Sequence, residues 1–200
     1  DMMVLLETSN VLRPDNYPEG LVGSGVKICE IQTSNGIEKL AVINLMGIYG
    51  MPMVENPFNW AKKLVTNLQE QNIKNIFLDF HAEVTSEKRI MLMMFKNQIS
   101  AICGTHTHVG TDDLQIFENT AYLTDIGLTG CRDNVIGMDS KIPIQKVTTG
   151  IGGHFEVPNS CKSILQMLVV DIDDGKASSA FKIKKYCNNS KLFITEAFID

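Results

Sequence analysis

The stretch IFLDFH at residues 76–81 decides the fold. Its short run of apolar residues is typical of a strand that is buried within a sheet. Before it, a helix is expected to begin at Asn56-Pro57, since asparagine caps helices well and proline suits their first position. After it, helical spacing returns from about residue 86 to residue 99. Two more strands are expected, near residues 102–103 and at 121–126. Strands that alternate with helices predict a mixed α/β core.

Antiparallel strands are expected at both ends of the chain. Near the start, the apolar runs 26–31 and 40–45 flank Ser34-Asn35-Gly36, and Asn-Gly between apolar runs is a strong hairpin signal. Near the end, the alternation of helix and strand stops, and Asp173-Asp174-Gly175 supplies a turn between two strands. The three strands expected there cover 165–172, 180–186 and 192–198.

Composition limits the function classes. The 200 residues carry a net charge of -5, which argues against a protein that coats nucleic acid with a basic stripe. No apolar run approaches the length of a membrane span. The five cysteines are odd in number and include no C-x-x-C pair, which predicts reduced thiols, no disulfide and a cytoplasmic location. They are Cys29, Cys103, Cys131, Cys161 and Cys187.

Three of the four histidines lie where predicted strands end. His81 closes the IFLDFH stretch, while His106 and His108 follow the next strand. The carboxyl ends of strands in open α/β sheets form the ligand crevice, so these side chains are expected to converge there. A single H-x-H pattern is weak, and a lone histidine is more often structural. The additional His81 favours a site for Zn, Fe, Mn, Co or Ni over one for Mg or Ca.

Four carboxylates lie near these histidines in the sequence. Asp79 alternates with apolar residues and either orients a ligand histidine or is a solvated strand residue. Glu83 and Glu87 are followed by basic residues, so a charge cluster at a helix start explains them without catalysis. Asp125, in the strand expected at 121–126, is the fourth.

At these residues the sequence resembles a known family. Phe80-His81-Ala82-Glu83 and Gly104-Thr105-His106-Thr107-His108-Val109 are similar to YmdB-like members of the calcineurin-like metallophosphoesterases. Supporting matches are LRPDNYPEG at 12–20, LAVINLMG at 40–47, TDIGLTG at 124–130 and GMD at 137–139. The blocks follow the order of the family and span nearly the whole chain, which makes the resemblance specific.

The resemblance implies a four-layer α/β/β/α sandwich, in a single domain over residues 1–200 that lacks its N-terminal strands and helices. It implies two divalent metal ions, Fe or Mn with Zn as an alternative. His81 and His106 are assigned to one ion and His108 to the other. The activity implied is hydrolysis of phosphodiesters, such as cyclic nucleotides, by a hydroxide held between two ions. The family's metal-binding Asp, its Glu-Asn pair and the Gly-Asn-His motif of its general acid are not found in this sequence. The chain is therefore expected to be part of a longer, active protein, and no catalytic acid is named in it.

Two other functions compete with this one. A non-catalytic relative would bind metal and nucleotide for regulation, and the missing ligands favour it. An amidohydrolase also uses H-x-H at a strand end, but its barrel needs about 250 residues and an early H-x-H, neither of which fits this chain. The expected partner is a small phosphodiester substrate. Neither binding to a membrane nor coating of DNA is expected, and a homo-oligomer is possible on the sequence alone.

Overall fold

The computed structural model describes residues 2–8, 11–34 and 36–199. Its helices are α1 (Met2–Thr8), α2 (Pro57–Glu70), α3 (Thr85–Phe95) and α4 (Lys141–Thr149). Its strands are β1 (Val26–Thr33), β2 (Gly36–Met46), β3 (Asn75–His81), β4 (Ala101–Thr105), β5 (Gln115–Phe117), β6 (Thr120–Leu123), β7 (Gly130–Cys131), β8 (Ser163–Asp173), β9 (Lys176–Tyr186), β10 (Leu192–Glu196) and β11 (Phe198–Ile199). Within this part of the chain the strands form a seven-stranded and a four-stranded sheet.

The seven-stranded sheet has the order β1-β2-β3-β4-β6-β5-β11. Its central strands β2, β3, β4 and β6 are parallel, β1 pairs antiparallel with β2, and β5 pairs antiparallel with β6 and parallel with β11. The fold is therefore mixed α/β, as the alternation of strands and helices predicted. The parallel register places His81 opposite Thr105, so β3 and β4 end side by side at one edge of the sheet.

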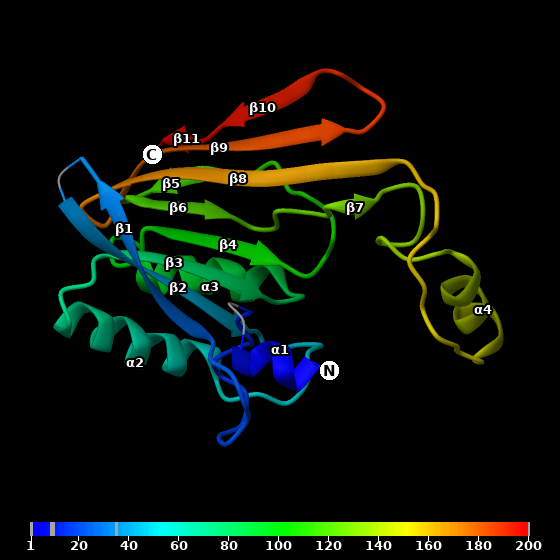
Figure 1. Ribbon diagram of the computed structural model, residues 1–200, viewed down its shortest axis with the longest axis horizontal. Coiled ribbons are helices and arrows are strands. Elements are labelled where there is room, and N and C mark those ends of the chain that lie inside the picture. The colour runs from blue at the N-terminus through cyan, green and yellow to red at the C-terminus, as the bar shows by residue number, and fades with distance from the viewer. Residues whose placement is uncertain (1, 9–10, 35, 200) are drawn as a thin grey trace.

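Three layers are visible in Figure 1. Helices α2 and α3 cover one face of the seven-stranded sheet, where their apolar side chains form a core with Ile43, Leu78 and Phe80. The four-stranded sheet, β10-β9-β8-β7, packs on the other face through Ala177 and Ala180 of β9. The fourth, helical layer that the resemblance implies is not seen among residues 2–8, 11–34 and 36–199. No helix in these same ranges has the length and apolar character needed to cross a membrane.

The helix boundaries follow from local chemistry. The side chain of Asn56 accepts hydrogen bonds from the amides of Phe58 and Asn59, and Pro57 opens α2, as predicted. α3 ends at Phe95, earlier than the expected residue 99. Lys96 has an extended ψ of 141° and Asn97 a left-handed φ of 61°, so the chain leaves the helix there.

The antiparallel ends are confirmed, with one change. β1 pairs with β2 and β8 with β9, although Asn35 of the expected first turn lies outside the described residues. The predicted strand 192–198 is divided between the sheets. Glu196 ends β10, and Phe198 starts β11, which pairs with β5 of the seven-stranded sheet.

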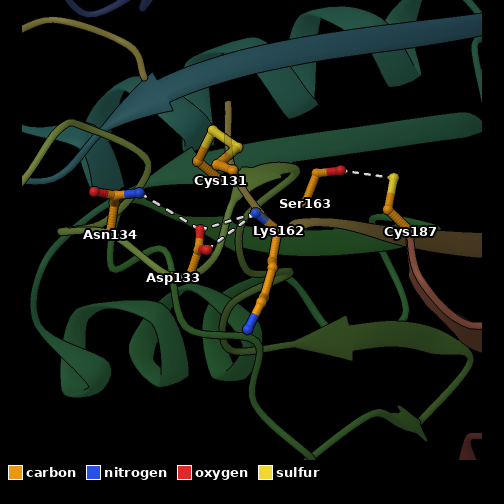
Figure 2. The surroundings of a disulfide bond; sticks show 7 residues. Cys131, Asp133, Asn134, Lys162, Ser163 and Cys187 are labelled. Atoms are coloured by element: carbon orange, nitrogen blue, oxygen red, sulfur yellow. Dashed lines mark hydrogen bonds between the residues drawn. A yellow bond between two sulfur atoms is a disulfide. The ribbon is translucent and has the colours of Figure 1, made fainter. Parts of the chain in front are cut away.

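The expectation that no disulfide forms was wrong, since Cys131 and Cys161 are bonded to each other (Figure 2). The two residues are 30 positions apart, and the segment with α4 lies between them. Cys131 of β7 pairs with Ser163 of β8, so the returning chain brings Cys161 beside it. Neither the odd number of cysteines nor their spacing in the sequence indicates that Cys131 and Cys161 lie side by side. Disulfides are typical of oxidising compartments, so the cysteines no longer support a cytoplasmic location.

Candidate metal centre

His81 and His106 meet at the edge where β3 and β4 end. His81 is the last residue of β3, and His106 directly follows β4. Nε2 of His81 and Nδ1 of His106 are hydrogen-bonded to each other over 3.1 Å, with the ring planes almost perpendicular at 86°. Two nitrogens that each lie about 2.1 Å from one metal ion are separated by about 3.0–3.4 Å. The spacing of this pair therefore suits two ligands of a single ion.

A chain of hydrogen bonds orients His81. The hydroxyl of Thr105 donates to Oδ1 of Asp79 over 2.8 Å, so it accepts from Nδ1 of His81 over 3.0 Å. This arrangement leaves Nε2 of His81 without a proton, with its lone pair directed toward His106. Burial, together with the nearby charges of His106 and Lys88, lowers the pKa of His81. The ring is thus kept neutral, which is the form that binds metals.

Asp79 therefore acts on His81 through Thr105 rather than by direct contact. The amide of Asn44 donates to the second oxygen of Asp79 over 3.0 Å and fixes the carboxylate. Burial raises the pKa of Asp79, while the hydrogen bonds from Thr105 and Asn44 oppose that shift. Of the two interpretations of Asp79, the structure favours orientation of a histidine over a solvated strand residue.

His108 lies further along the same loop and has a different partner. Its Nδ1 donates to the carbonyl of Ile136 over 2.8 Å, which leaves Nε2 as a free acceptor. Metal-binding histidines commonly donate their other ring N–H to such a carbonyl. Even so, no group of three or more His, Cys, Asp or Glu side chains is arranged to hold an ion in the part of the chain that the structure describes. The structure thus pairs His81 with His106 and leaves His108 apart.

The loop that carries these histidines has a strained backbone. His106 has a backbone φ of 113° and His108 a φ of 61°, values that residues other than glycine rarely adopt. Such conformations cost on the order of 1–3 kcal/mol each and persist only where the surroundings impose them. Between the two, the amide of Thr107 donates to Oδ2 of Asp125 over 3.0 Å. This contact fixes the backbone of the turn between the two histidines.

Asp125 is itself held by a buried ion pair. Nζ of Lys88 donates to Oδ2 of Asp125 over 3.0 Å, and both side chains are 1% exposed. Burial alone would raise the pKa of Asp125, but the amides of Thr107 and Gly127 and the ammonium of Lys88 hold it below its usual value. The loop of His106 and His108 is therefore held in place through Asp125 by Lys88, a residue of α3.

Gly104 is required by the close approach of two strands. A Cβ at this position would lie 1.7 Å from the carbonyl oxygen of Thr124, and neither backbone can move without breaking the β4–β6 pairing. Because Gly104 has no side chain, the segment that follows β6 can approach β4 closely. This approach places Asp125 next to the loop of His106 and His108.

The two glutamates differ from each other. Oε2 of Glu83 lies 3.1 Å from Nε2 of His106 at the surface. Glu87 lies in the first turn of α3, as the charge-cluster interpretation expected, but its side chain is fully buried. Its Oε1 accepts from the amide of Ile48 over 2.8 Å, and its Oε2 has no protein partner. Glu87 thus holds the loop that follows β2.

Sequence reasoning missed Lys88 and Thr105 at this site. A signal for Lys88 was present, because it lies three and four residues before Met91 and Leu92, on the buried side of α3. A charged residue on an apolar helix face requires a buried partner. No comparable signal marks Thr105, whose role depends on the register between β3 and β4.

Known proteins are similar to this chain in sequence and in fold. The model of the YmdB-like protein family matches residues 1–185. Over 184 residues the chain is 40% identical to the 2',3'-cyclic-nucleotide 2'-phosphodiesterase of Bacillus subtilis, a match that covers 92% of this chain and 67% of that protein. The chain spans only part of the length of three curated relatives, namely 67%, 57% and 62%.

Two solved structures resemble the fold over 98% of this chain. A hypothetical protein from Thermus thermophilus has a TM-score of 0.79 at 27% identity, and the match covers 71% of its chain. A novel phosphatase from Mycoplasma pneumoniae has a TM-score of 0.72 at 28% identity, with 66% of its chain covered.

Proposed function

This chain belongs to the YmdB-like protein family, and we propose that it forms most of a metal-dependent phosphodiesterase that acts on small phosphodiesters such as cyclic nucleotides. The observation that carries the proposal is the 3.1 Å approach of His81 Nε2 to His106 Nδ1 at the sheet edge. The similarity to a cyclic-nucleotide phosphodiesterase supports the substrate class. In this proposal residues 1–200 belong to one metallophosphoesterase domain, which further residues of the full-length protein complete as a four-layer sandwich.

The donor set fits divalent Fe or Mn, and Zn as well. His81 and His106 would hold one ion, and His108 would hold a second through its free Nε2. When bound, such ions neutralise phosphate oxygens and lower the pKa of an attacking water. The chain's own residues keep the ligands in place: Thr105 fixes the tautomer of His81, and Asp125 fixes the loop of His106.

Three histidines alone are too few to hold two ions. In this proposal the bridging carboxylate and the proton donor for the leaving alkoxide come from residues of the full-length protein outside this chain. The 200-residue chain should then bind metal weakly and lack turnover.

A hydrolysis assay tests the proposed function. The full-length protein should hydrolyse bis(p-nitrophenyl) phosphate and 2',3'-cyclic AMP, lose this activity in a chelator and regain it with added manganese. The 200-residue chain should show no turnover under the same conditions. Hydrolysis that persists in the chelator, or full turnover by the short chain, would contradict the proposal. A full-length protein that binds manganese and nucleotide without turnover would instead be the regulatory relative.

A further inference from the structure

A pocket opens beside His108. Its volume is about 360 Å³, within the range of small-molecule sites. The polar side chains that line it are His108, Arg132, Asn134, Gln166 and Lys184. The other described residues around it are apolar or glycine, and none is Asp or Glu. Because acidic residues outnumber basic ones 23 to 18 in the chain, a pocket with two cations and no carboxylate is suited to an anion.

Lys184 reaches this pocket because of the alternation along β9. Ala180, Lys182 and Lys184 share the face that is turned toward the seven-stranded sheet. Ala180 lies in the core between the sheets, and Lys182 is 6% exposed, with its ammonium donating to the carbonyl of Thr111 over 3.1 Å. Lys184 is the next residue on this face and borders the pocket. Lysine is rarely placed on an inner sheet face, so a binding role explains this position better than packing does.

Arg132 is placed by β7 and by the disulfide. It directly follows Cys131, and its amide donates to the carbonyl of Lys162 over 2.9 Å (Figure 2 shows the disulfide beside this segment). Its guanidinium lies 5.0 Å from the centre of the Tyr186 ring. Stacking on an aromatic ring orients a guanidinium and leaves its N–H groups available, which favours bidentate binding of phosphate.

A second, smaller pocket of about 280 Å³ adjoins the first and shares Gly110 and Lys184 with it. It is bordered by Tyr186 and Phe193, whose rings pack edge to face with centres 5.8 Å apart. Aromatic side chains next to a cationic groove are typical of sites where nucleic-acid bases stack. The first pocket thus presents two cations, and the second, which Asp112 also lines, presents two aromatic rings.

We propose that Arg132 and Lys184 bind a second phosphate of the substrate, next to the one that is cleaved. This inference rests on the proposed function and narrows it. The preferred substrate is then a nucleotide with at least two phosphates, such as a dinucleotide, rather than a cyclic mononucleotide. The adjoining aromatic pocket receives the base that follows the second phosphate.

Kinetics on the full-length protein test the inference with two substrates. One is 2',3'-cyclic AMP, which has a single phosphate, and the other is a diadenylate with a terminal 2',3'-cyclic phosphate, which has two. In Lys184→Gln and in Arg132→Gln, the ratio of kcat/KM for the diadenylate to that for the mononucleotide should fall about 10-fold, the loss expected for one charged hydrogen bond. Lys185→Gln removes the same charge from the outer face of β9 and should leave the ratio unchanged. A ratio within about twofold of the parent value in both pocket variants would overturn the inference.

Calorimetry on the metal-free full-length protein provides a test that does not depend on turnover. The parent protein should bind the diadenylate at least about 10-fold more tightly than 2',3'-cyclic AMP, and Lys184→Gln should remove this difference. Equal affinity for the two ligands in the parent protein would overturn the inference. A protein that hydrolyses nothing but shows this binding difference would refute the proposed function alone.

Discussion

Replacing His106 with alanine in the full-length protein is expected to reduce phosphodiester hydrolysis by at least about 10–100-fold, since loss of a mere outer-shell partner already costs that much. The change removes Nδ1, which lies 3.1 Å from Nε2 of His81, and with it one of two nitrogens placed for a single ion. The measurement is kcat/KM for bis(p-nitrophenyl) phosphate with added manganese, together with the bound manganese per protein.

His154→Ala is the matched control, because His154 is exposed in the segment between α4 and β8. It should hydrolyse the substrate at the parent rate. Full turnover by His106→Ala would show that the two-metal mechanism proposed for this edge of the sheet is wrong.

Replacing Lys88 with methionine is expected to lower the free energy of unfolding by about 3–5 kcal/mol, the usual result of removing one partner from a buried ion pair. The change leaves the carboxylate of Asp125 buried without its cation. The same carboxylate accepts from the amide of Thr107, so the loop of His106 and His108 should also loosen. Urea unfolding followed by circular dichroism measures the first effect, and bound manganese in the full-length protein measures the second.

Lys74→Met is the control for this change. Lys74 pairs with Asp174 at the surface, where both side chains are more than half exposed, and such pairs contribute little. Its unfolding midpoint should stay close to that of the parent. If Lys88→Met unfolded at the same urea concentration as Lys74→Met, the buried pair would not anchor the histidine loop.

Local patterns were sufficient for most of the fold. The run at 76–80, the Asn56-Pro57 helix start and the turn at Asp173-Asp174-Gly175 each depend on neighbouring residues, and each corresponds to an observed element. The nearness of His81 and His106 also followed from sequence, because parallel strands that are neighbours end at the same edge of a sheet.

Features that depend on contacts distant in sequence were not predictable in this way. The disulfide forms because the chain returns to β8 beside β7 after an excursion through α4, and no pattern in that segment indicates its path. The carbonyl that orients His108 belongs to Ile136, in a turn closed by the bridge between Val135 and Met138, 28 residues further along the chain. The burial of Glu87 depends on Ile48, which lies 39 residues away. In each case the partner is fixed by packing of the whole domain.

The manganese anomalous signal from crystals of the full-length protein tests the proposed metal centre most directly. One peak should lie within about 2.5 Å of both His81 Nε2 and His106 Nδ1, and a second should lie within the same distance of His108 Nε2. Peaks at other positions, with the nitrogens of His81 and His106 still hydrogen-bonded to each other, would contradict the assignment of these histidines as ligands.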